Sequence, residues 1–350
     1  MAPSPMLWPD IAKISRPGLS GEAMVDWSHF PKHILPKLQG HVAVRSLRRQ
    51  SRLWSNTSDF ANIDYGDVIH VDDRYLLIVG YTKEGRFGVE EQPKQWVPKV
   101  YDLVSGERNI LKLAFHETYT IRLGALEVTC YRSPEKEAQV IEFTRGNRSF
   151  MQGYTTLDDA GNLVRILDIV NGQRLDKVVY RMGDNHLDYF EHFLPDLLRQ
   201  FLISVDGIVL LHANGFKHGD IRRDHIYVDR EDGHFWWIDF DYDYYLPERP
   251  YAMDLFGLGN VLLFLIGQQN FRPSALLKDP AFGEKVFARI SEGDLALVSR
   301  DRIFNLKKIY PYIPDPLNDI LLYFSAGAEV MYDSVEEFYN DLRRAVDKIW

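Results

Sequence analysis

The 350-residue chain has one cysteine, no long run of apolar residues and fewer basic than acidic side chains. The single cysteine, Cys130, excludes an intramolecular disulfide and is typical of a reducing compartment. The most apolar stretch, residues 255–267, is shorter than the roughly 20 residues that a bilayer requires. The N-terminus lacks the basic start and apolar run of a signal peptide. We therefore expect a cytoplasmic protein without a membrane span.

The net charge of −9 argues against nucleic-acid binding, which requires many cations placed against phosphates. It leaves room for a nucleotide, which needs only a few cations. The basic residues are concentrated at the start, where the first 63 residues hold eight Lys or Arg and four Asp or Glu. Four arginines lie between positions 45 and 52. This segment is either a solvated face or flexible tail, or a docking arm for an acidic partner.

Hydrophobic periodicity divides the chain into a β-rich first half and a helical second half. Short apolar runs predict strands at 68–71 and 75–79, a hairpin across Ser105-Gly106, a further strand pair within 119–131, and strands at 150–154 and 163–170. Ser133 and Pro134 predict the start of a helix. Apolar residues at three- and four-residue spacing predict one amphipathic helix over 190–205, and residues 254–267 predict a buried helix. This order favours two lobes with a cleft between them.

Two aspartates, Asp220 and Asp239, are the strongest chemical signal. They lie 19 residues apart, each on a loop beside an apolar, strand-like run. A β-hairpin between them would bring both carboxylates to one cleft. Such a pair suits phosphoryl transfer, because one carboxylate can orient the attacking hydroxyl while the other holds magnesium on the phosphates.

These motifs resemble those of the protein kinase-like superfamily. The run His218-Gly219-Asp220 resembles its catalytic loop, which implies that Asp220 is the base. The run Asp239-Phe240-Asp241 resembles its metal-binding motif, which implies that Asp239 holds magnesium. Both spellings are closer to choline and aminoglycoside kinases than to typical protein kinases.

The resemblance also implies a nucleotide site in the first half. Gly85 and Gly88 lie where the family has its glycine-rich loop, and Lys112 lies where it has the lysine that binds the α- and β-phosphates. Glu137 resembles the helix glutamate that pairs with this lysine. Glu135 and Glu142 are competing candidates on the same predicted helix.

Three further positions follow from the same resemblance. Residues 165–172 look like the fifth strand and hinge, where backbone groups of Asp168 and Val170 would meet the adenine edge. Asp254 resembles the buried aspartate that accepts hydrogen bonds from the catalytic loop. Arg222, two residues after Asp220, lies where a lysine steadies the γ-phosphate in serine/threonine kinases, and an arginine can do the same.

The sequence departs from the family pattern near the catalytic loop. His225 replaces the asparagine that binds a second metal, and imidazole is a poor magnesium ligand that suits Mn²⁺ better. Gly219 replaces the arginine that senses a phosphorylated activation loop. Only 15 residues separate Asp239 from Asp254, and Asp241 replaces a glycine. We expect a short segment that is ordered without phosphorylation.

The sequence therefore predicts an α+β, bilobal protein kinase-like fold with a β-rich N-lobe and an α-helical C-lobe. We expect an N-terminal extension, partly flexible, over 1–65, the N-lobe and hinge over 66–172, and the C-lobe over 173–350. The expected ligands are ATP and Mg²⁺, or Mn²⁺. The expected activity is phosphorylation of a protein serine or threonine hydroxyl. Two alternatives are a small-molecule kinase similar to choline and aminoglycoside kinases, and a nucleotide-binding pseudokinase regulator.

Overall fold

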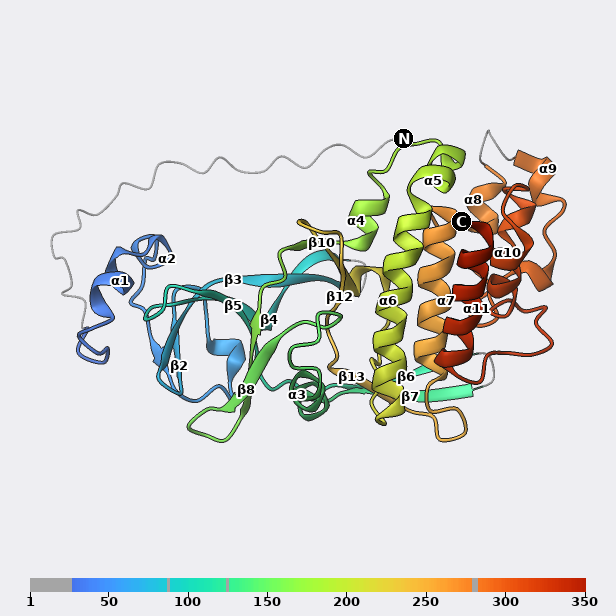
Figure 1. Cartoon of the computed structure of the whole chain (residues 1–350). Helices are drawn as coiled ribbons and strands as arrows, with labels where there is room; N and C mark the ends of the chain where they lie inside the picture. Colours follow the sequence, from blue (N-terminus) through green and yellow to red (C-terminus); the bar gives the residue numbers. More distant parts are fainter. Residues whose placement is uncertain (1–26, 87–88, 124–125, 279–282) are drawn as a thin grey trace, which may run out of the picture.

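The structure is a computed structural model that describes residues 27–86, 89–123, 126–278 and 283–350. Its elements form a β-rich half, which contains the N-terminal part of the chain, and a helical half, which contains the C-terminal part (Figure 1). None of the helices in these ranges is long and apolar enough to cross a membrane. The predicted mixture of α and β structure, and its order along the chain, are confirmed.

A seven-stranded sheet in the order β1-β2-β3-β4-β5-β9-β8 forms the β-rich half. Its strands are β1 (Leu53–Trp54), β2 (Val68–Val71), β3 (Arg74–Arg86), β4 (Val89–Asp102), β5 (Arg108–Lys112), β8 (Gly153–Leu157) and β9 (Leu163–Asp168). Neighbouring strands are antiparallel except β1 and β2. The predicted hairpin across Ser105-Gly106 joins β4 to β5, and Gly106 has the positive φ of 86° that favours glycine in such a turn.

The described part of the N-terminal extension packs against this sheet. The helices α1 (Leu35–Gly40) and α2 (Val42–Arg45) contribute to an apolar cluster with β2, β3 and Leu103, and the short 3-10 helix η1 (Phe60–Asn62) follows them. Arg49 and Arg52 bind the buried carboxylate of Asp67 with N–O distances of 2.6 and 2.7 Å. Two arginines of the basic segment therefore stabilise the lobe itself, and its role as a docking arm stays a prediction.

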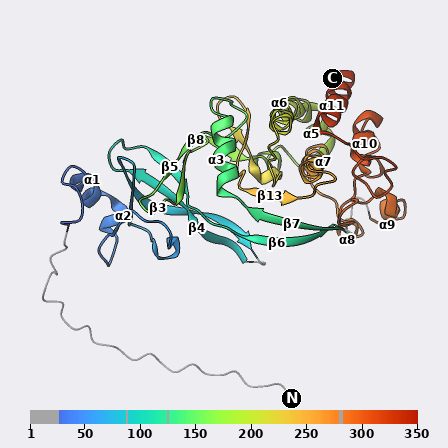
Figure 2. The ribbon, with the colours of Figure 1, turned by 90° about the horizontal axis from the view of Figure 1, so that it is seen from below.

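A second sheet links the two halves. The strand pair expected within 119–131 is present as β6 (Thr118–Leu123) and β7 (Leu126–Arg132). The third strand, β13 (Tyr242–Tyr245), comes from the segment that follows Asp239, and it pairs antiparallel with β7. Figure 2 shows β6 and β7 running from the β-rich half along the helical half. Part of the short segment after Asp239 is therefore a strand, which the sequence did not predict.

The helix predicted to begin at Ser133 is α3 (Pro134–Phe143), which directly follows β7. The Ser133 hydroxyl accepts a hydrogen bond of 3.1 Å from the amide of Lys136, and acidic side chains occupy the first turn. Both features stabilise a helix N-terminus, where amide groups lack partners within the helix.

The helical half is built around the buried helix α7 (Ala252–Gly267), as its apolar sequence predicted. The other helices are α4 (Leu175–Val179), α5 (His186–His192), α6 (Leu194–Ala213), α8 (Pro273–Leu276), α9 (Gly283–Phe287), α10 (Asp315–Leu322) and α11 (Val335–Ile349), with the 3-10 helices η2 (Arg223–His225), η3 (Glu292–Asp294) and η4 (Leu306–Lys308). A small sheet of β10 (Gly172–Arg174), β11 (Ile226–Asp229) and β12 (Phe235–Trp237) carries the loops around Asp220 and Asp239.

One sequence prediction is wrong here. The single helix expected over 190–205 is two helices, α5 and α6, that meet at Phe193. Pro195 lies in the first turn of α6. Proline has no amide hydrogen and clashes with the preceding turn, so it starts a helix and does not continue one.

Candidate active site

Lys112 and Glu137 meet between β5 and α3. Lys112 is the last residue of β5, and its Nζ donates to Oε1 of Glu137 over 2.7 Å. Glu137 is fully buried, whereas the competing candidates Glu135 and Glu142 lie on the exposed face of α3. The helix phase therefore selects Glu137 as the partner of the lysine.

The same lysine contacts the predicted metal-binding motif. Its Nζ donates to Oδ1 of Asp239 and lies 3.3 Å from Oδ2 of Asp241. Asp239 has a φ of +71°, which is uncommon for a residue other than glycine. Such conformations persist where surrounding contacts hold them, and here both carboxylates of the motif are held by Lys112.

Two arginines complete a buried network of charges. Arg132, the last residue of β7, donates to Asp241 over 2.6 Å, and Nε of Arg165, in β9, lies 3.1 Å from Glu137. With Lys112 they place three cations against three carboxylates, all at most 9% exposed. Buried charges are stable only when paired in this way. Removal of one member would leave an uncompensated charge in the protein interior.

This network shifts the pKa values of its members. Burial opposes the charge on Lys112, but Asp239, Asp241 and Glu137 raise its pKa above the ordinary value. Burial also opposes the charge on Asp239, but Lys112 and Lys94 hold its pKa well below the ordinary range. Asp239 is therefore ionised at neutral pH, as a metal ligand must be.

Asp220 lies on a loop that is fixed by its backbone. Asp254, in α7, accepts hydrogen bonds of 2.8 and 2.9 Å from the amides of His218 and Gly219. On the other side, Nζ of Lys136 donates to the carbonyl of His218 over 2.7 Å. Asp254 thus accepts hydrogen bonds from the backbone of this loop, as the resemblance of its motif implied.

Gly219 allows the segment after Asp239 to approach this loop closely. Its φ is +90°, and a Cβ at this position would lie 1.8 Å from the carbonyl oxygen of Tyr242 in β13. Lys136 donates to that same carbonyl over 2.8 Å. The absence of an arginine at position 219 therefore has a local cause, since β13 occupies the space that any side chain would need.

His225 lies between the two aspartates. Its Nδ1 is 2.9 Å from the backbone carbonyl of Asp220, and its Nε2 is 3.6 Å from Oδ2 of Asp239. A carbonyl oxygen only accepts, so in the neutral ring Nδ1 carries the proton and Nε2 has the lone pair. That lone pair faces the carboxylate, which is the arrangement of two ligands on one cation.

The donor set fits one divalent ion bound by Asp239 and His225. Among the described residues, no group of three or more His, Cys, Asp or Glu side chains could hold a metal. Magnesium and manganese in nucleotide sites take few protein ligands and complete their shells with phosphate oxygens and water. Asp239 and His225 would therefore bind a divalent ion only together with the phosphates of a nucleotide.

Burial raises the pKa of Asp220, and the nearby charges of His225 and Arg222 act in the opposite direction. Arg222 is half exposed and binds Asp224 over 2.7 Å, with its NH1 3.8 Å from Asp220. Its guanidinium therefore lies near Asp220. A role on the γ-phosphate stays a prediction, since Asp224 holds part of that group.

The predicted glycine-rich loop lies only partly within the described residues. Gly85 lies in β3, Gly88 lies outside the described residues, and residues 89–96, read from the sequence as an insertion, belong to β4. This extension brings Nζ of Lys94 to 3.7 Å from Oδ2 of Asp239. A second lysine thus faces the position predicted for the metal and phosphates.

The predicted hinge follows β9. The amide of Asp168 donates to Gln152, and the carbonyl of Val170 accepts from Gly172. Contact of this segment with an adenine edge stays a prediction.

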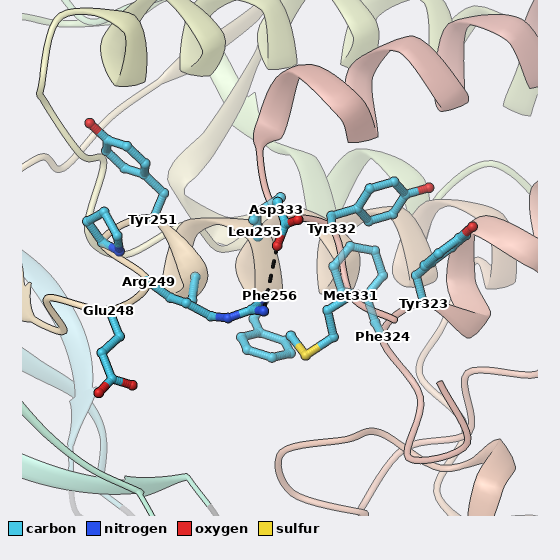
Figure 3. A pocket seen from close by; sticks show the side chains of 12 residues that line it. Glu248, Arg249, Tyr251, Leu255, Phe256, Tyr323, Phe324, Met331, Tyr332 and Asp333 are labelled. Atoms are coloured by element: carbon cyan, nitrogen blue, oxygen red, sulfur yellow. Dashed lines mark ion pairs between the residues drawn. The ribbon is translucent and has the colours of Figure 1, made fainter. Parts of the chain in front are cut away.

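A cavity of about 250 Å³ in the helical half is lined by Asp220. Another, of about 330 Å³, lies beside the start of α7, where Arg249 and Asp333 approach to 3.6 Å (Figure 3). Phe256 and Phe324 contribute to the walls of both.

The sequence did not identify Arg132, Arg165, Lys94 or Lys136 as site residues. Arg165 carried the same signal as Lys112, a single cation within an apolar strand. The others had no comparable signal, because their partners lie far away in the sequence.

No family model and no curated protein matches the chain. Among solved structures, the kinase domain of PknI from Mycobacterium tuberculosis is similar with 14% identity and a TM-score of 0.41 over 77% of this chain and 96% of that chain. Two mutant forms of the same domain are similar with 13% identity and a TM-score of 0.42, over 77% of this chain and 95% of each. The function proposed below rests on the geometry of the site.

That geometry follows the element order that the sequence predicted. The strand of Lys112 precedes the helix of Glu137, β8 and β9 lead to the predicted hinge, and the loops of Asp220 and Asp239 lie between α6 and α7. The chain has an α+β fold with a β-rich lobe and a helical lobe, which the second sheet links.

Proposed function

We propose that this protein is an ATP-dependent phosphotransferase that transfers the γ-phosphoryl group to a hydroxyl acceptor. The observation that carries the proposal is the convergence of Lys112, Glu137 and Asp239, which three separate elements bring into direct contact. Asp220 lies on the far side of His225 from Asp239, with 3.5 Å between its Oδ2 and Nδ1 of the ring.

Each residue has a role that its surroundings support. Lys112, positioned by Glu137, binds the phosphates as a point charge. Asp239 and His225 would hold a divalent ion, which would supply positive charge against the phosphates during transfer. Asp220 accepts the proton of the acceptor hydroxyl, and its raised pKa suits that task better than an ordinary aspartate would.

A nucleotide-binding regulator without turnover is the second candidate. His225 replaces a hard amide oxygen ligand, and Lys94 adds a second cation beside Asp239. Both features weaken binding of a second magnesium ion. Measurement of ATP turnover and ATP binding on the same sample separates the two candidates.

The test uses Lys112→Met and Asp220→Asn, with Lys99→Met as the matched control. Lys99 is exposed on the neighbouring strand β4. We expect Lys112→Met to lower turnover or ATP affinity by about 100-fold or more, since a charge-assisted contact to the phosphates is lost. Asp220→Asn should abolish transfer and leave ATP binding intact, and Lys99→Met should behave as wild type.

Wild-type turnover in Lys112→Met or Asp220→Asn would refute the assignment of these residues. Tight ATP binding without transfer to any proteins or metabolites would favour the regulator. The sequence favours a protein hydroxyl as acceptor, with a small molecule as the alternative. The cavity beside Asp220 bears on that choice.

A further inference from the structure

The cavity beside Asp220 is lined on one side by the catalytic loop and on the others by α7 and residues 296–304. Its volume is about 250 Å³, which is below the ~300–1,000 Å³ of sites for drug-sized ligands. Phe256, Leu297 and Phe304 contribute apolar walls. A compound that fills this cavity is therefore small and lies against the loop that carries Asp220, the residue that we propose as the base.

A guanidinium forms the polar side of this cavity. NH1 of Arg302 donates to Oδ1 of Asn260 over 2.5 Å, and Nδ2 of Asn260 is fixed by the carbonyl of Phe256 in the preceding turn of α7. The backbone carbonyl of Arg302 accepts from Ala296 over 2.8 Å. The arginine is thus held at both its backbone and its side chain, and the side chain is one-third exposed.

Arg302 also lines an adjoining cavity of about 420 Å³, together with Arg222 and Arg223. These two arginines have other contacts, because Arg222 binds Asp224 and Arg223 lies over the ring of Phe264 at 4.6 Å. The nearest carboxylate oxygen to Arg302, on Asp301, is 3.8 Å away. Its fork of N–H groups therefore suits a carboxylate or phosphate supplied by a ligand.

We infer that this cavity binds the acceptor and that the acceptor is a small hydroxyl compound with a carboxylate or phosphate group, which Arg302 recognises. The inference rests on the proposed function, and it names the substrate class of the same site. It also favours the small-molecule alternative over a protein acceptor.

The surroundings of β13 support the same choice. An extended peptide commonly binds by adding a strand to a free sheet edge. One edge of β13 is paired with β7, and on the other side the carbonyl of Tyr242 packs against Gly219 and accepts from Lys136. The segment after Asp239 therefore has little backbone left for a peptide strand.

The test measures binding of D-glycerate and glycerol 3-phosphate to the full chain saturated with a non-hydrolysable ATP analogue and Mn²⁺. Glycerol and choline serve as neutral and cationic hydroxyl probes. The variants are Arg302→Gln and the control Arg300→Gln, which lies two residues away and pairs with Glu292 outside the cavity.

We expect at least one anionic probe to bind the wild type, and Arg302→Gln to weaken that binding by about 10- to 100-fold, as for loss of a hydrogen bond to a charged group. Arg300→Gln should change it less than twofold. The affinity for the ATP analogue should be the same in all three proteins, which shows that the variants are folded.

Equal binding of the anionic probes to wild type and Arg302→Gln, or no binding of either anion to the wild type, would overturn the inference. Transfer to a peptide, glycerol or choline that Arg302→Gln leaves unchanged would also overturn it, while the proposed function would stand. Failure of the proposed function has a different signature, namely no binding of the ATP analogue or transfer that survives Asp220→Asn.

Discussion

Gly219→Ala is the perturbation whose effect can be worked out most directly from the structure. A Cβ at position 219 would lie 1.8 Å from the carbonyl oxygen of Tyr242, and real Cβ contacts are essentially never below 3.0 Å. The difference, 3.0 − 1.8, is about 1.2 Å, by which β13 or the loop of Asp220 must move. Neither is free to do so, because Asp254 holds the loop and β7 holds β13.

Two costs follow from this substitution. A non-glycine residue at positive φ costs about 1–2 kcal/mol, and overpacking in a fixed environment adds about 1–3 kcal/mol. Displacement of catalytic groups by about 1 Å lowers turnover by about 100-fold. We therefore expect Gly219→Ala to lose roughly 2–5 kcal/mol of unfolding free energy and about two orders of magnitude in phosphotransfer rate.

Gly215→Ala is the matched control. Gly215 has a similar φ of +78°, but a Cβ there would meet nothing within 4 Å. Gly215→Ala should lose only the unfolding free energy that a positive φ costs a non-glycine residue, about 1–2 kcal/mol, and its turnover should stay that of the wild type. Denaturant unfolding and a phosphotransfer assay on both variants provide the comparison. Equal stability losses and equal rates in the two variants would refute the close approach of β13 to the loop.

Three further predictions concern the metal, acid stability and regulation. His225→Asn should shift the ratio of activities with Mn²⁺ and Mg²⁺ toward Mg²⁺, since an amide oxygen replaces the imidazole nitrogen; identical metal profiles would contradict this. Burial lowers the pKa of His186 to about 4, so the folded state disfavours its protonation, and stability falls as the pH drops from about 6.5 toward 4. Between pH 7.5 and pH 4.5, His186→Gln should lose about 2 kcal/mol less unfolding free energy than the wild type, as measured by denaturant unfolding. The same pH dependence in both proteins would contradict this prediction. Treatment with phosphatase, or incubation with ATP, should change activity less than tenfold, because the segment between Tyr242 and Tyr251 is already anchored by β7; a tenfold rise on phosphorylation there would contradict this.

The parts of the site that the sequence predicted are those carried by short, local patterns. The cap at Ser133 sets the phase of α3, and that phase alone places Glu137 inside and Glu135 outside. The roles of Asp254 and of the pair Lys112–Glu137 were implied by the family resemblance of their motifs. The contact of Lys112 with Asp239 was not predicted.

The parts that the sequence did not predict depend on pairings across the chain. β7 and β13 are separated by more than 100 residues, and neither strand indicates its partner through its own alternation of side chains. Arg132 ends β7, so its role on Asp241 became visible only once that pairing was known. The break before α6 is different, since Pro195 was visible in the sequence and should have outweighed the apolar spacing.

The link between the lobes changes how the site is controlled. In a kinase that is switched by phosphorylation, the glutamate helix and the metal motif are brought together by ordering a long loop. Here the chain enters α3 directly from β7, β7 pairs with the segment after Asp239, and the amide of Ser133 donates to the carbonyl of Asp241 over 2.7 Å. A movement of α3 away from the site would therefore break a strand ladder and leave Arg132 and Asp241 as buried, unpaired charges. We therefore expect the assembled arrangement to persist without phosphorylation.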